Sequence, residues 1–581
     1  MTEEQTIESI LVADCGAVNT NLLLLERVAE SYRFVAQAEA LTTAGAPWND
    51  VSVGVVHAIR DLERITGRKF HANGKVIVPR EGLSGTDAFV VILSAPEPLH
   101  VVLAGLVPEM SLESAYHAAA SIYASVEAVL CREGGLRSPE ETWARTVRDL
   151  APDVVLLVGG VDGGASRPVM ELADAIALGA SMLESDRRPR LIYAGNAKLR
   201  SQVTKLLGEI VTVDVVDNVR PTVDTEHLGP TQALLEQLYI EQRLYKLPGV
   251  DTLSAWSRLP LLPTATAFGR VVEYLWHREG RQERGVLGVD VGAASITIAA
   301  CQHGELALSV HSQKGSVYGA LALAEDEGVA ALQQWLPEEL DVAQILAVLY
   351  NRALKPWTIP QQLPELWVEQ AVVREMLRSA AREARKIWGE SQEGLLPGFD
   401  PILVSGGSLV HMPRPGQILL TLLDGLEPTG ISTVLLDTNR AAPALGAIAG
   451  IKPLAAASAL DAGTLVPLGT VISPVGKAHP GEGILQMRII YEDGSTLDVE
   501  AHYGELELWP LLPGQRATLE LRPNRRFDIG LCAGTWWQGA GHGWFVGIGG
   551  GWAWPPVGVA GESRTAPSPS AALALGCGGL R

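Results

Sequence analysis

Residues 11–20 read LVADCGAVNT, and residues 286–297 read VLGVDVGAASIT. Each stretch is an apolar run, then Asp, one further residue and Gly, and then small or hydroxyl residues that lead into a second apolar run. Each therefore predicts a β-hairpin whose corner carries the Asp-x-Gly sequence. Because the phrase occurs at Asp14 and again at Asp290, the sequence indicates two copies of one structural plan, a duplicated domain rather than a solenoid.

Length and composition limit the class of protein. The chain has 581 residues, of which 47% are hydrophobic, so about two to four domains are expected. The net charge of −20 argues against nucleic acid and anionic membrane surfaces as partners, and favours a protein or a small ligand. No apolar run reaches the roughly 18 residues of a membrane span, and the acidic N-terminus does not resemble a signal peptide.

The cysteines indicate a reducing compartment, and we expect a cytoplasmic protein. They show neither CxxC nor CxxH spacing, which speaks against zinc, iron–sulfur clusters and a disulfide framework. The five are Cys15, Cys131, Cys301, Cys532 and Cys577.

Alternating strand and helix patterns predict α/β halves with mostly parallel sheets. We expect a first half at 1–245 and a second at 246–455. Each has its hairpin corner near the start and a strand ending in Gly-Gly near the end, at 159–160 and 406–407. Residues 456–527 alternate and predict a small all-β module.

Residues 528–581 differ from the rest of the chain in composition. This stretch is rich in Gly and Trp, and we expect an atypical, poorly folded tail, with an aromatic binding platform as the alternative. Its tryptophans are Trp536, Trp537, Trp544, Trp552 and Trp554.

The two corners suit a phosphate chain gripped from both sides. Gly16 and Gly292 lack a Cβ, so the backbone can turn sharply and aim N–H groups at phosphate oxygens. Carboxylates at strand ends can hold Mg²⁺ through its waters. We therefore predict an ATP and Mg²⁺ site in which Asp14 and Asp290 are the catalytic and metal-holding carboxylates. The other predicted contacts are Gly16, Asn19, Thr20, Gly292, Ser295, Thr297 and, against the adenosine, Gly406 and Gly407.

This order of corners and Gly-Gly strand end resembles the actin–hexokinase–Hsp70 superfamily. The resemblance implies duplicated actin-like (ribonuclease H-like) ATPase domains. Two departures put fast hydrolysis in doubt. Ala17 and Val18 stand where the superfamily has hydroxyl residues, and Thr297 stands where it has an Asp. A slow ATPase or nucleotide switch fits these losses better than a metabolic kinase.

A closer resemblance covers about residues 8–455. The stretches at 153–177, 190–203 and 213–242 resemble the MutL-type accessory family of coenzyme-B12-dependent glutamate (methylaspartate) mutase, which is unrelated to the mismatch-repair protein of similar name. The run GGVDGG at 159–164 is the most specific piece. Its Asp162, Gly163 and Gly164 could lie at the rim of a ligand cleft, or Asp162 could form an Asx-turn or helix cap.

The family resemblance implies an ATP-using, chaperone-like protein that protects or reactivates an adenosylcobalamin-dependent mutase, which would be its protein partner. Cobalamin itself is not implied as a ligand. Two alternatives stay open: a sugar or carboxylate kinase of the same superfamily, with Asp162 as the base, and a nucleotide-indifferent actin-like scaffold. The oligomeric state is not indicated.

A row of basic residues marks the helix predicted for EMLRSAAREARKIWG at 375–389. We expect a solvated helix face, and docking of an acidic partner is the alternative.

Overall fold

The computed structural model describes residues 7–131, 139–279, 284–326, 328–337, 340–388, 397–509, 516–530, 537–542 and 544–548. The chain forms two compact units. Unit 1 comprises Met1–Ala95, Thr252–Ala307 and Gln313–Arg581, and unit 2 comprises Pro96–Asp251 and Leu308–Ser312. The division expected near residues 245, 455 and 527 stays a prediction.

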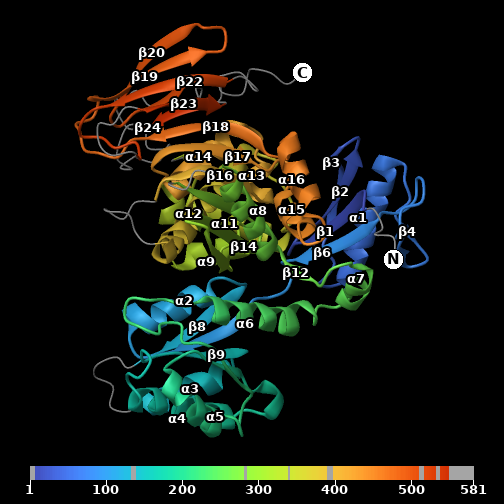
Figure 1. The fold of residues 1–581 in the computed structure, drawn as a ribbon, viewed down its shortest axis with the longest axis vertical. Coiled ribbons are helices and arrows are strands. Elements are labelled where there is room, and N and C mark those ends of the chain that lie inside the picture. Colours follow the sequence, from blue (N-terminus) through green and yellow to red (C-terminus); the bar gives the residue numbers. More distant parts are fainter. Residues whose placement is uncertain are drawn as a thin grey trace. The chain divides into compact units, whose positions relative to one another are not determined.

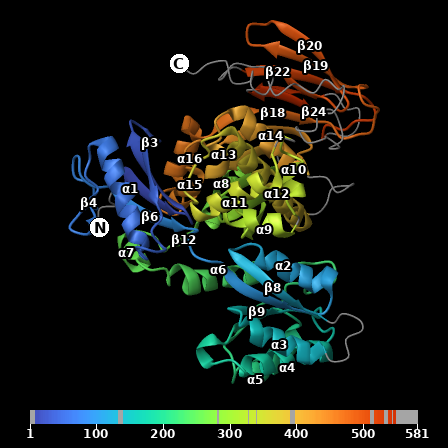
Figure 2. The same ribbon diagram turned by 180° about the vertical axis from the view of Figure 1, so that it is seen from behind.

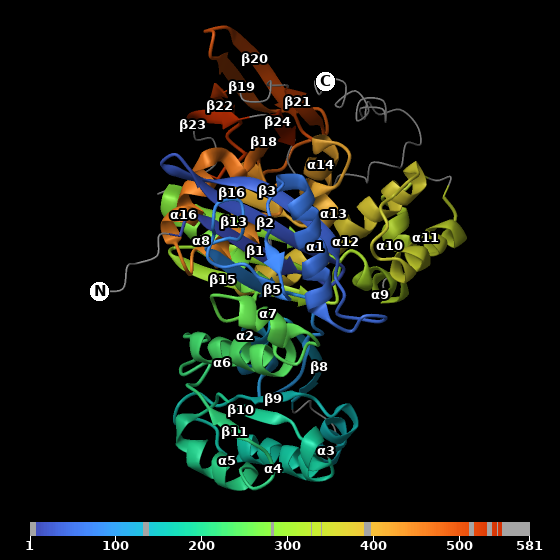
Figure 3. The ribbon, with the colours of Figure 1, turned by 90° about the vertical axis from the view of Figure 1, so that its right-hand side faces the viewer.

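The first sheet of unit 1 is built on the first corner. Its central strand β1 is antiparallel to β2, which is antiparallel to β3, and on its other side β1 is parallel to β6, which is parallel to β12. Helix α1 (Val51–Thr66) packs on β2 and β3 (Figure 3). In sheet order the strands are β3 (Ser31–Leu41), β2 (Asn19–Val28), β1 (Ser9–Cys15), β6 (Ala88–Leu93) and β12 (Leu262–Pro263).

The second sheet repeats this plan. Strand β13 is antiparallel to β14 and parallel to β16, which is parallel to β17. The strands in order are β15 (Glu305–Ser312), β14 (Ser295–Gln302), β13 (Gly285–Val291), β16 (Phe399–Ser405) and β17 (Gly430–Leu436), followed by β18 (Val466–Ser473), β24 (Trp544–Ile548) and β21 (Leu506–Trp509). Both predicted hairpins are confirmed. The shared order of five strands is that of duplicated actin-like (ribonuclease H-like) domains.

One part of the expected repeat is wrong. The strand that ends in Gly159 and Gly160 belongs to a separate sheet, whereas the counterpart of β16 in the first sheet is β6. Strand β6 is followed by Ser94 and Ala95, so no glycine pair marked it in the sequence.

Two helices of unit 1 cross each other, and each begins soon after the end of a strand, β12 or β17. Helix α8 (Thr264–Glu279) packs against α15 (Ala442–Ile448) (Figure 1). Buried side chains of the second sheet and of the long helix α12 (Leu363–Trp388) form one apolar core with those of α14 (Pro415–Leu426). The remaining helices of unit 1 are α7 (Val250–Trp256, shared with unit 2), α9 (Tyr318–Asp326), α10 (Ala330–Gln333), α11 (Val342–Leu354), α13 (Gly407–Val410) and α16 (Pro453–Ala459).

Unit 2 is a doubly wound parallel sheet of order β11-β10-β9-β7-β8. Helices α2 and α6 lie on one face and α3, α4 and α5 on the other (Figure 2). Its strands are β7 (Leu99–Ala104), β8 (Ala124–Leu130), β9 (Val154–Leu157), β10 (Arg190–Tyr193) and β11 (Val213–Val215). Its helices are α2 (Glu113–Ala119), α3 (Pro139–Leu150), α4 (Arg167–Ser181), α5 (Arg200–Leu207) and α6 (Gly229–Tyr239).

The C-terminal region is all-β, as expected. A four-stranded sheet of order β20-β19-β22-β23 forms an apolar core together with Ile431 of β17 and Ile472 of β18. Its strands are β19 (Gly483–Tyr491), β20 (Thr496–His502), β22 (Arg516–Pro523) and β23 (Trp537–His542). Two segments of the stretch expected to be atypical thus form strands, β23 and β24. Trp536, Trp552, Trp554, Cys532 and Cys577 lie outside the described residues.

None of the helices in the described part of the chain is both long and apolar enough to cross a membrane.

The crossing of α8 and α15 depends on Gly446. A Cβ at this position would lie 1.8 Å from the backbone oxygen of Ala267. We predict that Gly446→Ala destabilises the protein by about 2–4 kcal/mol, because the backbone of α8 must move away. Gly45→Ala is the matched control, since a Cβ at Gly45 meets no atom within 4 Å. Thermal unfolding of both variants measures the difference, and equal melting temperatures would contradict the prediction.

Candidate functional site

The two hairpin corners have the same hydrogen-bonded turn. The backbone N–H of Gly16 donates to the oxygen of Asn19 at 3.0 Å, and the N–H of Gly292 donates to the oxygen of Ser295 at 3.0 Å. The duplication therefore extends from the strand order to single backbone bonds at the predicted phosphate corners.

Each corner leaves N–H groups available to a ligand. Within the described residues, the N–H groups of Ala17, Val18, Ala293 and Ala294 donate no hydrogen bond, and all four residues are partly exposed. Backbone donors at a turn can bind phosphate without any side chain. The first corner thus lacks hydroxyl donors at Ala17 and Val18, but the backbone N–H groups of these residues remain available.

The hydroxyl groups at the corners support the turns. Thr42 donates to the oxygen of Gly16 at 2.8 Å and lies 2.9 Å from the hydroxyl of Thr20, which is buried. In the second corner the N–H of Ser316 donates to the oxygen of Gly292 at 3.0 Å. The structure thus places Thr20 in the support of the turn, with its hydroxyl directed at Thr42.

Three carboxylates gather at the strand ends of unit 1. Asp14 is the sixth residue of β1, Asp290 is the sixth residue of β13, and Asp437 directly follows β17. Asp14 and Asp290 are partly exposed, whereas Asp437 is fully buried. The partial exposure of the first two is what contact with a ligand requires.

Two of the three carboxylates, Asp14 and Asp437, accept hydrogen bonds from neutral groups. Thr264, the first residue of α8, donates its hydroxyl to Asp14 at 2.9 Å. Asp437 accepts the N–H groups of Ala441 and Ala442 at 2.8 Å each, and the hydroxyl of Ser405 at 3.0 Å. The starts of α8 and α15 are therefore tied to the carboxylate cluster.

The carboxylates are poorly compensated. Burial raises the pKa of Asp14 to about 6; the charge of Asp437 adds to this rise, while Thr264 and Arg440 oppose it. Burial raises the pKa of Asp290 to about 7, and the charges of Asp14 and Asp437 add to the rise against Arg440. Burial also raises the pKa of Asp437. A cation bound among them would favour their ionised forms.

Arg440 is the cation that the structure brings to this cluster. Its guanidinium donates to both carboxylate oxygens of Glu39 in β3, at 2.6 and 3.2 Å. A Cβ on Gly407 would lie 3.8 Å from its Nη1. Arg440 therefore lies beside the loop predicted for adenosine, and it ties the first sheet to the turn before α15.

The Gly-Gly loop lies directly against the second corner. Gly406 has a φ of +99°, and a Cβ there would lie 2.3 Å from the oxygen of Val291. Only glycine fits this approach. The structure thus brings Gly406 and Gly407 beside Asp290 and Gly292, as a common binding site would need.

The donor set fits a hard divalent cation. Asp14 faces Asn21 across the first hairpin, and Asp290 faces Thr297 across the second. Within the described residues the buried Oδ1 of Asn21 has no hydrogen-bond partner. Carboxylate and amide oxygens with no sulfur are the ligands that suit Mg²⁺.

Asp162, Gly163 and Gly164 lie in unit 2, after β9, in an exposed loop. The carboxylate of Asp162 accepts the N–H of Ala197 at 2.9 Å and the amide of Asn218 at 3.0 Å. In the structure Asp162 thus holds neighbouring loops together, and its role toward a ligand stays a prediction.

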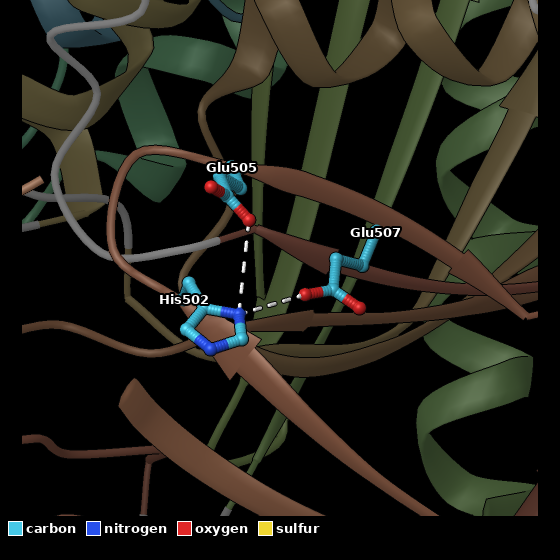
Figure 4. A group of neighbouring side chains, drawn as sticks. All are labelled: His502, Glu505 and Glu507. Atoms are coloured by element: carbon cyan, nitrogen blue, oxygen red, sulfur yellow. Dashed lines mark hydrogen bonds and ion pairs between the residues drawn. The ribbon is translucent and has the colours of Figure 1, made fainter. Parts of the chain in front are cut away.

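A second group of possible metal ligands lies between β20 and β21 (Figure 4). The Nδ1 of His502 lies 3.3 Å from Glu507 and 3.7 Å from Glu505. The three residues lie at the link between β20 and β21, which belong to different sheets, and their contacts with one another account for the arrangement without a metal.

The sequence analysis missed Asp437, Arg440, Asn21 and Thr264. Asp437 had a usable signal, since it follows the apolar run ISTVLL as Asp14 and Asp290 follow theirs. Thr264 and Arg440 had none, because their partners Asp14 and Glu39 lie far away along the chain. Asn21 lies in the same hairpin as Asp14, and only the cross-strand register shows that the two face each other.

The raised pKa values predict a stability that depends on pH. In the unfolded chain an Asp has a pKa near 3.8, and in the folded protein Asp290 has one of about 7. The folded state therefore holds the proton more tightly, and stability falls as pH rises from about 4 to 7. Asp290→Asn should remove part of this loss and stabilise the nucleotide-free protein by about 1–3 kcal/mol at pH 8.

Thermal unfolding between pH 4.5 and 8.5 tests this expectation. Asp174→Asn, on the exposed face of α4, makes the same charge change as a control. A gain for Asp290→Asn that is the same at every pH, or equal to that of the control, would disprove the assignment.

Comparisons with known proteins place the chain in a family. The family model described as MutL protein matches residues 10–463, whereas no curated protein matches the sequence. Among solved structures, nucleotide-free acetone carboxylase is 13% identical, with 88% of this chain and 82% of that chain covered and a TM-score of 0.35. Glycerol dehydratase reactivase is 12% identical, with 77% and 100% covered and a TM-score of 0.30.

The ROK hexokinase from Thermus thermophilus is 9% identical, with 77% of this chain and 99% of that chain covered and a TM-score of 0.26. At such identities and TM-scores these structural likenesses carry no information on function. The family model, by contrast, spans most of the sequence. The chain therefore belongs to the MutL family, which its own sequence motifs resemble.

Proposed function

We propose that the protein is an ATP-binding accessory protein that protects or reactivates an adenosylcobalamin-dependent mutase, with glutamate mutase as the first candidate. The observation that carries the nucleotide part is the pair Asp14 and Asp290 at the ends of the corresponding strands β1 and β13, with Asp437 close to both, beside two equivalent turns with available N–H groups. Membership of the MutL family supports the accessory role.

In this proposal the two corners hold the phosphates and the Gly406-Gly407 loop holds the adenosine. Asp14 and Asp290 would carry Mg²⁺, which would neutralise phosphate charge. The oxygens of Asn21 and Thr297 would face the metal's waters from the neighbouring strands. Binding changes the affinity for the mutase only if the nucleotide prefers one of two conformations of the protein.

Hydrolysis should be slow. A water needs a well-placed base or a positioning group for attack on the terminal phosphate. Thr297 stands where the superfamily resemblance implies an Asp, and Asp437 has its oxygens occupied by Ser405, Ala441 and Ala442. The geometry suits a nucleotide switch.

Calorimetry with MgATP and MgADP tests the site. We expect micromolar binding to the wild type and a loss of at least about tenfold in Asp14→Ala with Asp290→Ala, which removes both metal-holding carboxylates. Asp174→Ala, which removes one exposed carboxylate of α4, is the control and should bind as the wild type does. Binding should also tighten as pH rises from 6 to 8, because protonated carboxylates cannot hold the metal. A folded wild type without affinity for either nucleotide would favour the scaffold alternative.

The partner is tested with purified glutamate mutase that has lost activity during turnover. Adding the protein with MgATP and fresh adenosylcobalamin should restore activity, and the Asp14→Ala, Asp290→Ala double variant should not. If ATP binds but no mutase activity returns, the choice of partner is wrong. Substrate-stimulated formation of ADP with a sugar or carboxylate would point to the kinase alternative.

A further inference from the structure

Three arginines of α12 share one cavity. Arg378, Arg382 and Arg385 follow the spacing of one helix face, and together with Glu427 they line a cavity of about 320 Å³. Helix α14 packs against α12 here, and Glu427 directly follows its last residue, Leu426. The sequence marked this basic row, and the proposed nucleotide site makes no use of it.

The three arginines outnumber the one carboxylate, Glu427, that lines the cavity with them. Arg378 lies 3.5 Å from one oxygen of Glu427, and Arg385 lies 3.7 Å from the other. Both separations exceed the roughly 2.7–3.2 Å of a good N–H···O hydrogen bond. Arg378 also lies 3.8 Å from Glu375, and Arg385 donates to the backbone oxygen of Leu426 at 2.7 Å. Arg382 is exposed, and among the described residues no carboxylate pairs with it. In a chain with a net charge of −20, this local surplus of guanidinium groups is unusual.

Glu427 itself is held in an unfavourable backbone conformation. Its φ is +51° and its ψ is +57°, the left-handed region that glycine and asparagine favour. Its carboxylate nevertheless spans two guanidinium groups. Burial lowers the pKa of Arg385, and the charges of Arg382 and Arg378 add to this against Glu427. Glu427 and Glu375 together thus offer two carboxylates to three guanidinium groups, and Glu427 is the one that lines the cavity.

We propose that this cavity binds a small polyvalent oxyanion, a phosphate or a polycarboxylate, between Arg378, Arg382 and Arg385, and that Glu427 competes with it for the same arginines. The planar guanidinium group binds such oxygens with two parallel hydrogen bonds. The volume lies at the lower end of small-molecule sites, so a compact anion fits better than a large ligand.

Calorimetry with inorganic phosphate and with citrate, at constant ionic strength, tests the proposal on the full chain. We expect Arg382→Gln and Arg378→Gln each to weaken binding by about tenfold, the loss of one charged hydrogen-bonding group. Glu427→Gln should tighten binding severalfold, because it removes the competing carboxylate. Lys386→Gln, an exposed neighbour on α12 that does not line the cavity, is the matched control.

The Asp14→Ala, Asp290→Ala variant separates this cavity from the proposed nucleotide site and should bind these anions as the wild type does. A preference for phosphate or for citrate identifies which oxyanion class the cavity selects. Thermal unfolding without anion shows whether each variant folds. No anion binding by the wild type, or equal losses in Arg382→Gln and Lys386→Gln, would overturn the proposal.

Discussion

Unit 1 is organised around the cost of placing three carboxylates next to one another. Asp14, Asp290 and Asp437 all have pKa values raised by burial, and Arg440 is the cation that opposes the rise in the first two. An ionised group removed from water is tolerated only with hydrogen bonds and opposite charge. The hydroxyl of Thr264 and the N–H groups at the start of α15 supply the hydrogen bonds, so both crossing helices begin where the charge lies.

That convergence explains why the helices fit so closely. The position of α8 is fixed at its first residue by Asp14, and that of α15 by Asp437. The distance between the two helices is then set by Gly446, through its close contact with Ala267. The close approach of Gly406 to Val291 has the same effect on the loop after β16. The duplicated sheets supply the carboxylates. The glycines Gly446 and Gly406, which have no side chain, set the distances between the elements that hold these carboxylates.

The sequence predicted the site residues that belong to a short local motif, and it missed those that only the pairing and packing of the fold bring to the site. Asp14 and Asp290 could be found because strand, carboxylate, turn and second strand follow one another within about ten residues. Thr264 gave no signal, since its partner Asp14 lies 250 positions away along the chain. Asn21 lies in the same hairpin as Asp14, but only strand pairing shows that the two residues face each other. The glycine pair at 159–160 misled for the same reason. It looks like the pair at 406–407, but sheet membership is decided by strand pairing that no short motif records.

The ion pair between Arg440 and Glu39 spans 401 positions, and this separation has a consequence for biosynthesis. A ribosome adds about 5–20 residues per second. Tens of seconds therefore pass between the synthesis of Glu39 in β3 and that of Arg440, which neutralises its charge. Strand β12, which completes that sheet, also follows the main segment of unit 2, Pro96–Asp251, in the chain. The nascent first half therefore carries Asp14 and Glu39 before Arg440 exists, and the site is completed only after residue 440 has been made.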